Sequence, residues 1–171
     1  MTSSDPGSGS TRIRAAILSD QASIVEFNRQ LAIETEDKIL DEATLHRGVA
    51  RALADSDSRI RYWIAEADTP PRAIGQAGVT REWSDWRNGW IWWLQSVYVH
   101  ADYRGQGVFR AILEEIRREA LAQPDVIGLR LYVEEANLQA QKTYEALGLA
   151  HGGYHVYEQL WLDRFERDSS A

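Results

Sequence analysis

The sequence predicts one domain of the α/β or α+β class, built on a mixed β-sheet. Three observations support this: strand and helix patterns alternate along the chain, one strand is apolar on both faces, and 171 residues is an ordinary length for one domain. The expected order of elements is β-α-α-β-β-β-α-β-α-β within residues 11–171. Residues 1–10 are polar and contain no apolar run, so we expect a disordered tail rather than a signal peptide.

The first three elements follow from hydrophobic periodicity. Residues 11–18 alternate enough to predict a strand. Ser19 and Asp20 then offer an N-cap to a helix whose apolar side chains recur at helical spacing. A second helix is predicted over residues 42–54, and the polar residues 34–38 connect the two helices.

The middle of the chain predicts three strands joined by hairpin turns. Residues 61–66 and 73–81 are the first two strands, and the glycines of the second are typical of a β-bulge. Asn88 and Gly89 form a strong hairpin signal before the third strand. That strand, residues 90–99, is aromatic or β-branched almost throughout, which predicts a position inside the sheet with both faces covered.

The remaining elements alternate between helix and strand. Residues 108–121 place apolar side chains on one face and charged side chains on the other, which predicts a helix. Residues 126–133 predict a strand. Residues 137–147 predict a helix that begins at a capping asparagine and ends before Gly148. Residues 154–161 predict a last strand.

Composition excludes several kinds of function. The chain has no cysteine, which excludes disulfides, thiolate metal ligands and a cysteine nucleophile, and no other metal site is expected. The net charge of -7 argues against a nucleic-acid partner and mildly favours a cationic substrate. No segment approaches the roughly 20 apolar residues of a membrane span, so we expect a cytoplasmic protein without a membrane partner.

The segment Arg104-Gly105-Gln106-Gly107 lies between the most apolar strand and the clearest helix. The N–H groups at a helix start have no intrahelical partner, and glycines let a phosphate approach them closely. This order of elements therefore predicts a phosphate cradle. A P-loop is excluded because no lysine lies between Lys38 and Lys142, and a dinucleotide fingerprint is disfavoured because Arg110 replaces its third glycine.

Residues 95–109 resemble the acetyl-CoA motif of the GNAT acetyltransferase superfamily, whose pattern is Gln/Arg-x-x-Gly-x-Gly/Ala. Arg104 and Gly107 match this pattern, whereas Phe109 replaces its small last residue. Asn137 with residues 143–149 is similar to a second landmark of the family, Asn…Tyr-Glu-x-x-Gly-Phe, so two motifs occur in the right order.

The resemblance implies a splayed, mostly antiparallel mixed sheet and acetyl-CoA as the acyl donor. It implies that the backbone of Val97, Tyr98 and Val99 pairs with the pantetheine arm, that Asn137 lies beside this arm, and that Tyr144 stands near the thioester sulfur. The residues expected at the pyrophosphate are Arg104, Gly105, Gln106, Gly107, Val108, Phe109 and Arg110.

Acetyl transfer to an amine needs a donor to the oxyanion, a proton for the thiolate and a neutral nitrogen. Tyr144 suits the role of proton donor, although its spacing also fits a packing face. A backbone N–H near Val97 suits the oxyanion. The base stays open, because Gln95 and Ser96 on the strand are not bases. Five side chains elsewhere remain candidates for the base: Glu34, Glu36, Glu82, His100 and Glu134. A water chain is a further alternative.

A tryptophan-rich stretch suggests where an acceptor binds. Trp83 and Trp86 flank a turn beside Glu82, so aromatic faces and carboxylates would meet a cation there. Glu34, in the connection between the first two helices, is a further candidate for acceptor binding. Trp90, Trp92 and Trp93 are better explained as packing within the strand.

Two functions fit these observations. The first is an N-acetyltransferase that uses direct attack in a ternary complex on a small-molecule or protein amine. The alternative is a non-catalytic acyl-CoA-binding sensor or interaction module, which the missing strand carboxylate and Phe109 would favour. Exposed aromatic surface around Trp83 and Trp86 would equally serve as a homodimer contact.

Overall fold

Five strands and four helices make up the part of the chain that the computed structural model describes, namely residues 11–54, 59–68 and 70–161. The elements are β1 (Thr11–Ala15), α1 (Gln21–Glu36), α2 (Glu42–Ala54), β2 (Arg61–Asp68), β3 (Pro71–Ser84), β4 (Gly89–Val99), α3 (Val108–Leu121), β5 (Val126–Leu131) and α4 (Leu138–Ala146). Short 3₁₀ turns at Leu18–Asp20 and Ala101–Tyr103 precede α1 and α3.

The strands form one sheet in the order β1-β2-β3-β4-β5. Neighbours are antiparallel except β4 and β5, which are parallel because α3 crosses between them. The parallel register runs from Trp90 opposite Val126 to Leu94 opposite Leu131, and the strands are not paired beyond it. Since β4 continues to Val99, its last five residues have no partner strand on that side.

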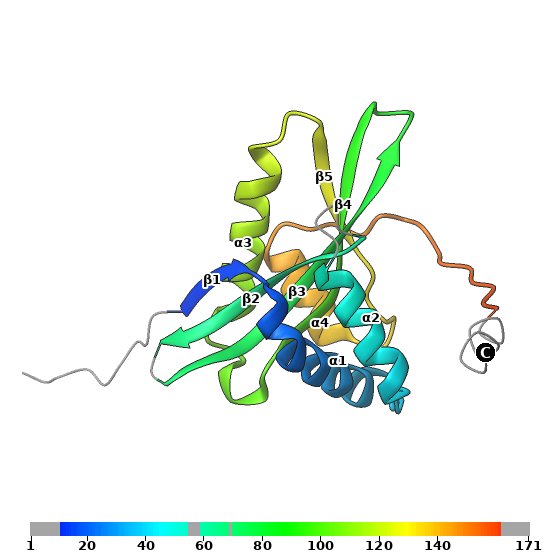
Figure 1. Cartoon of the computed structure of the whole chain (residues 1–171). Coiled ribbons are helices and arrows are strands. Elements are labelled where there is room, and N and C mark those ends of the chain that lie inside the picture. The colour runs from blue at the N-terminus through cyan, green and yellow to red at the C-terminus, as the bar shows by residue number, and fades with distance from the viewer. Residues whose placement is uncertain (1–10, 55–58, 69, 162–171) are drawn as a thin grey trace, which may run out of the picture.

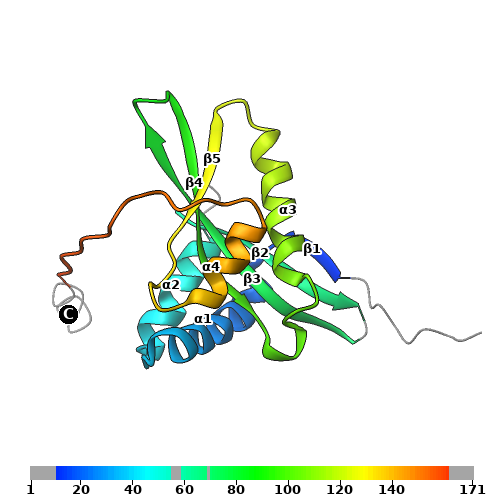
Figure 2. The same ribbon diagram turned by 180° about the vertical axis from the view of Figure 1, so that it is seen from behind.

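Helices cover both faces of the sheet. Helices α1 and α2 lie on one face, and α3 and α4 lie on the other, as the two opposite views show (Figures 1 and 2). On the α1 face, Ile24 and Val49 pack against Ile64 of β2. On the α3 face, Ile112 and Ile116 are fully buried in the larger of the two cores.

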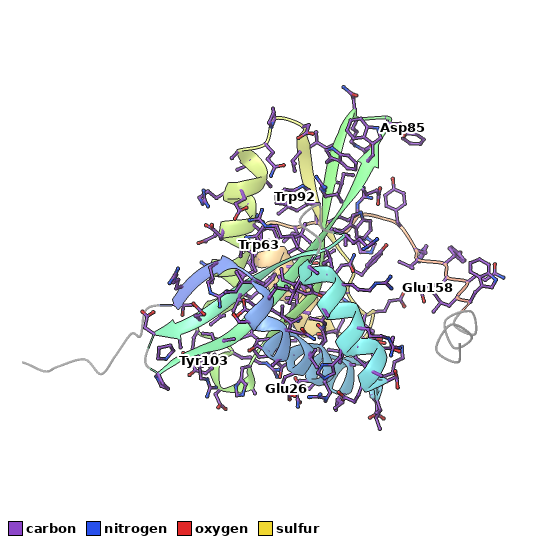
Figure 3. The ribbon with its side chains drawn as sticks, in the orientation of Figure 1. Glu26, Trp63, Asp85, Trp92, Tyr103 and Glu158 are labelled. Atoms are coloured by element: carbon purple, nitrogen blue, oxygen red, sulfur yellow. The ribbon has the colours of Figure 1, made fainter. Side chains whose placement is uncertain are left out.

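Two tryptophans anchor the larger core. Trp63 of β2 and Trp92 of β4 lie between the sheet and α3, and their ring centroids are 6.1 Å apart (Figure 3). The indole N–H of Trp63 donates to Glu119 of α3 over 3.0 Å, so the buried polar atom is satisfied. Arg61 pairs with the same carboxylate at 2.7 Å. This cluster fixes the position of α3 on the sheet.

Most predicted elements are confirmed, including the fold class. Helices α2 and α3 have the predicted bounds, because each carries a clear apolar face. Helix α1 extends into the predicted connection, residues 34–38, and its last residue is Glu36. The C-cap residue Asp37 has φ 51° and ends the helix. The predicted bulge occurs as register shifts on both sides of β3, beside Gly75 and Gly78.

One predicted strand is wrong. Residues 154–161 alternate like a strand, but they form no strand here and their side chains are exposed. A strand needs a neighbour for its backbone groups, and the hydrophobic pattern alone cannot supply that neighbour. The predicted N-terminal tail, residues 1–10, lies outside the described residues, as do residues 162–171.

Candidate active site

The predicted phosphate cradle lies at the end of β4. The chain leaves Val99, makes the 3₁₀ turn Ala101–Tyr103 and enters α3 at Val108. Gly105 and Gly107 have φ values of 74° and 80°, a backbone conformation that side chains with a Cβ disfavour. This conformation turns the chain into the helix and leaves the loop exposed to solvent.

The N-terminus of α3 carries free hydrogen-bond donors. Gly107 is the N-cap residue and offers no capping side chain, so the N–H groups of the first turn lack a side-chain acceptor. A Cβ built on Gly107 would meet no atom within 4 Å, so open space lies beside this backbone. Together with the helix dipole, these amides form a site suited to phosphate oxygens.

Arg104 links this loop to α1. Its Nε donates to the carbonyl of Val99 at 2.9 Å, and its Nη2 donates to Glu34 in the last turns of α1. The hydroxyl of Tyr98 donates to the other Glu34 oxygen at 2.8 Å. Burial and this carboxylate raise the pKa of Tyr98 to about 12, so the phenol stays protonated. The side chain of Arg104 therefore fixes the loop relative to α1.

The gap between β4 and β5 opens beside this loop. Because pairing with β5 ends at Leu94, one edge of residues 95–99 presents backbone N–H and C=O groups without a strand partner. An extended ligand can pair with such an edge in the manner of a strand. Val97, Tyr98 and Val99 lie on this edge, between the parallel register and the phosphate cradle.

A β-bulge interrupts β4 within this edge. Ala77 of β3 lies opposite two residues of β4, Ser96 and Val97, and Ser96 has φ 50°. The carbonyl of Ser96 accepts from the Nε2 of Gln76 at 3.1 Å, and the same nitrogen donates to Asn28 of α1 at 2.7 Å. Gln76 is fully buried, so this network holds the bulge in a conformation that a serine would otherwise avoid.

Helix α4 borders the gap from the α3 face. Asn137 caps it, because its side-chain oxygen accepts from the N–H of Ala140 at 3.0 Å. At the other end Arg117 of α3 donates to the carbonyl of Leu147, which ties the two helices together. Tyr144 faces α3, and burial raises the pKa of its hydroxyl.

Phe109 and Tyr144 contact each other. Their ring centroids lie 5.5 Å apart with the planes at 71°, an edge-to-face geometry that aromatic pairs favour. Within the described residues the hydroxyl of Tyr144 makes no hydrogen bond, so packing against Phe109 sets the direction of the phenol. The side chain that departs from the family pattern is therefore a neighbour of the predicted proton donor.

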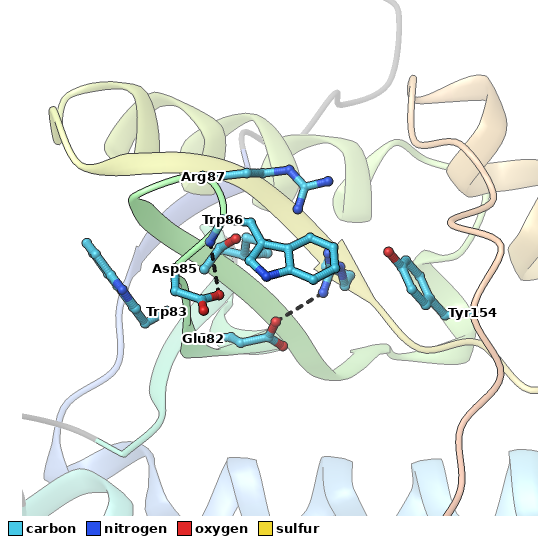
Figure 4. Close-up of a pocket in the computed structure, with 9 residues that line it drawn as sticks. Glu82, Trp83, Asp85, Trp86, Arg87 and Tyr154 are labelled. Atoms are coloured by element: carbon cyan, nitrogen blue, oxygen red, sulfur yellow. Dashed lines mark hydrogen bonds and ion pairs between the residues drawn. The ribbon is translucent and has the colours of Figure 1, made fainter.

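The tryptophan-rich hairpin forms a separate pocket of about 220 Å³. Trp86 at the hairpin tip and Tyr154 of the C-terminal segment approach it from two sides (Figure 4). Glu82 accepts from the indole of Trp93 at 2.5 Å and from Arg130 at 3.2 Å. The lining residues are Glu82, Trp83, Ser84, Asp85, Trp86, Arg87, Ile91, Arg130 and Tyr154.

The charges of this pocket balance. Glu82 and Asp85 supply two carboxylates, and Arg87 and Arg130 supply two cations. The Arg130 guanidinium lies 5.1 Å from the ring centroid of Trp93 and 5.8 Å from that of Tyr154. The pocket therefore offers aromatic faces, the Glu82 carboxylate and the Arg130 guanidinium, which lies over aromatic rings. Its surface is not purely anionic.

The structure separates the sequence-predicted residues into two groups. The loop and the free edge of β4 border the gap between β4 and β5, and Tyr144 packs against Phe109 in the first turn of α3. Glu82, Trp83 and Trp86 gather at the hairpin, whereas Glu34 lies at the cradle with Tyr98 and Arg104. Sequence reasoning missed Gln76 and Arg130. The sole signal for Gln76 is that it is a polar residue within residues 73–79, which are otherwise small or apolar.

The described part of the chain holds neither a metal-binding cluster nor a membrane-spanning helix. Within it, no three His, Asp or Glu side chains are grouped to hold a metal ion. None of its helices has the combined length and apolar character needed to cross a bilayer.

Known proteins resemble this chain in sequence and in fold. Residues 25–149 match the acetyltransferase (GNAT) family. A possible acetyltransferase from Clostridium difficile 630 is 38% identical with a TM-score of 0.80, and the match covers 88% of this chain and 97% of that one. A predicted acetyltransferase with acetyl-CoA from Clostridium acetobutylicum is 18% identical, with a TM-score of 0.71 and coverage of 88% and 96%.

A third solved structure shares the fold. It is the ribosomal-protein-alanine N-acetyltransferase from Brucella melitensis biovar Abortus 2308, which is 16% identical with a TM-score of 0.71 and coverage of 89% and 100%. The resemblance seen in the two sequence motifs is thereby confirmed, as are the acyltransferase class and acetyl-CoA as the acyl donor. The match over residues 25–149, with the 38% identity to a solved structure, shows that the chain belongs to the acetyltransferase (GNAT) family.

Proposed function

We propose that this enzyme transfers the acetyl group of acetyl-CoA directly to an amine while both substrates are bound. The observation that carries the proposal is the gap between β4 and β5, with the amide-rich loop at its mouth and Tyr144 beside it. One elongated ligand with phosphates at one end and an extended arm at the other fits this arrangement. Its thioester would then lie near the bulge at Ser96.

Each end of the donor has suitable partners. The backbone amides from Gly105 to Arg110 would hold the pyrophosphate, with Arg104 keeping the loop in place through Glu34. The free edge at Val97, Tyr98 and Val99 would pair with the pantetheine arm. Asn137 uses its oxygen as a helix cap, which leaves its amide nitrogen to donate to this arm.

The transfer step has a defined balance of protons. The amine nitrogen forms a bond to the carbonyl carbon, and the oxyanion accepts from a backbone N–H that the bulge near Val97 releases from the ladder. When the C–S bond breaks, the Tyr144 hydroxyl gives its proton to the thiolate. Its raised pKa keeps that proton in place until the thiolate forms.

The attacking nitrogen must also lose a proton. Gln95 donates to Thr80 at 2.7 Å and Gln76 holds the bulge, so the polar side chains nearest to Ser96 on this face are amides and not bases. We therefore propose that water carries this proton to solvent.

The acceptor would enter from the face that bears α1, because Trp93 and Gln95 alternate along β4 with residues that pack into the core on the α3 face. Glu82, Trp83 and Trp86 would bind its cationic or ring-bearing part at the hairpin pocket. The acceptor amine belongs to a small molecule or to a protein. The Brucella neighbour is named for a ribosomal-protein alanine and another neighbour for glucosamine-6-phosphate, and at 16% and 17% identity they share with this chain the fold alone.

Release of the thiol of CoA in the presence of a panel of amines tests the proposal. We expect release that depends on one class of amine, with the acetylated product visible by mass spectrometry. The same amines with acetyl-CoA and without protein are the control. Tight binding of CoA with no transfer to any amine, including those of a metabolite extract and a peptide library, would instead identify a sensor module.

Substitution of Gly107 by valine should weaken CoA binding. A β-branched residue at φ 80° is strained by about 1–2 kcal/mol, and its Cβ would occupy the open space beside the amides. We expect an affinity loss of about tenfold or more in calorimetry with CoA. Gly48→Ala is the matched control, because Gly48 lies in α2 and a Cβ there meets no atom within 4 Å. Equal affinity of the two variants would exclude the cradle.

Replacement of Tyr144 by phenylalanine should slow turnover and spare CoA affinity. Loss of a general acid lowers kcat by about 10²–10⁴-fold, whereas the phenylalanine ring preserves the contact with Phe109. Tyr103→Phe is the control, since the described contacts of Tyr103 are made by its ring and its backbone. If kcat of Tyr144→Phe matched that of the control, the tyrosine would be a packing residue.

The pH dependence of turnover follows from the pKa of Tyr144. Burial raises this pKa above the ordinary value of about 10, and the active form is the protonated one. Activity should therefore not fall between about pH 7 and pH 9, and should rise there as the amine substrate deprotonates. A kcat profile that declines within this window in the natural protein and is flat in Tyr144→Phe would show that Tyr144 titrates there, which would contradict the raised pKa.

A further inference from the structure

Gln76 is a fully buried polar side chain in the middle of β3. Its Nε2 donates to the carbonyl of Ser96 at 3.1 Å and to Asn28 of α1 at 2.7 Å, whereas its buried Oε1 has no partner among the described residues. Turning the amide over would place an oxygen against the Ser96 carbonyl, where both atoms are acceptors. The bond to Ser96 is therefore kept although the amide's own oxygen stays unpaired.

The peptide group between Ser96 and Val97 carries two local costs. Ser96 has φ 50°, a conformation that residues with a Cβ disfavour, and its carbonyl is the one that Gln76 bonds. The unpaired oxygen of Gln76 is the second cost, which an apolar side chain like those of nearby Ile74 and Val79 would avoid. Costs of this kind persist where a function depends on the conformation that they maintain.

The bond from Gln76 determines the direction of the Val97 N–H. In a planar trans peptide, the carbonyl of one residue and the N–H of the next point in opposite directions. The Ser96 carbonyl points to the Gln76 amide, which lies on the side of β4 that faces β3. The Val97 N–H therefore points away from β3. On that side β5 pairs only as far as Leu94, so this N–H faces the gap between β4 and β5.

We propose that Gln76 is a positioning residue for acyl transfer: by bonding the Ser96 carbonyl it aims the Val97 N–H at the carbonyl oxygen of acetyl-CoA. The inference rests on the proposed function, which places the thioester near the bulge. When the amine attacks, negative charge gathers on that oxygen, and an N–H already aimed at it stabilises the charge without reorganisation. Asn28 holds the Gln76 amide in turn, so α1 takes part in the alignment.

Infrared spectroscopy of bound acetyl-CoA tests this alignment without an acceptor amine. A carbon-13 label at the acyl carbonyl isolates the band of that one group. Because an aimed N–H polarises the carbonyl, we expect a lower stretching frequency in the natural protein than in Gln76→Met, whose side chain is apolar and of similar length. Trp63→Phe is the matched control, since it also removes a buried donor, the indole N–H bonded to Glu119 on the α3 face, and its band should match that of the natural protein.

The amide resonance of Val97 identifies the donor itself. In nitrogen-15-labelled protein, exchange of CoA for acetyl-CoA should move the Val97 amide proton downfield, as a new hydrogen bond does. The movement should be smaller in Gln76→Glu, which keeps the shape of the side chain and removes its N–H donors. This second variant keeps the test decisive if Gln76→Met does not fold.

Turnover separates alignment from binding. With an amine identified by thiol release, kcat of Gln76→Met should fall by about tenfold or more, less than the 10²–10³-fold effect of removing an oxyanion donor outright. The KM for acetyl-CoA should be retained, because the lost interaction develops in the transition state. A fall in acetyl-CoA affinity with kcat unchanged would contradict the assignment of Gln76.

The remaining outcomes distinguish this inference from the proposed function. Equal carbonyl bands in the natural protein and Gln76→Met, with acetyl-CoA bound to both, would overturn the role of Gln76 and leave amine-dependent transfer standing. An equal displacement of the band by Trp63→Phe would also overturn it, since a general loosening of the fold would then explain the effect. Failure of the natural protein to bind acetyl-CoA in calorimetry would overturn the proposed function as well.

Discussion

The backbone of β4 beyond Leu94 is the constraint on which the site depends. A strand inside a sheet needs hydrogen-bond partners on both edges, and β5 provides them only as far as Leu94. The parallel direction of β5 follows from the α3 crossover, so the strand that ends the pairing and the helix that offers the amides come from one β-α-β unit. An unpaired strand edge and a helix start with free amides therefore lie at the same end of one strand, where the proposed donor would bind.

Polar contacts from α1 make this end of β4 rigid. The Gln76 amide joins the bulge at Ser96 to Asn28, and Glu34 joins Tyr98 to Arg104. Gln76 is fully buried, where a hydrogen bond costs more to break than at the surface. Donors that are held in place before a reaction stabilise developing charge without reorganisation. Helix α1 thus fixes both the bulge in β4 and the loop that follows this strand.

Local patterns predicted the helices α2 and α3, the cap at Asn137 and the glycine loop, because each depends on residues within one turn of its own position. The role of Glu34 could not be predicted in this way, since its partner Arg104 lies 70 residues later in the sequence. The same limit explains residues 154–161, whose alternation specifies a strand without specifying the neighbour. The pocket residue Arg130 was missed because a charged residue within a strand is ordinarily read as solvent-facing.

Phe109 shows how a departure from a family pattern can be accommodated. A small residue at this position would leave space between the first turn of α3 and the ring of Tyr144, and the phenylalanine ring fills that space edge-to-face. The bulky side chain need not block the loop, because the proposed cradle would use backbone amides that precede it in the exposed loop. It connects α3, which begins at the proposed phosphate cradle, to α4, which carries the proposed proton donor. The hydroxyl of Tyr144 makes no hydrogen bond within the described residues, so the contact with Phe109 is what orients the half-buried ring.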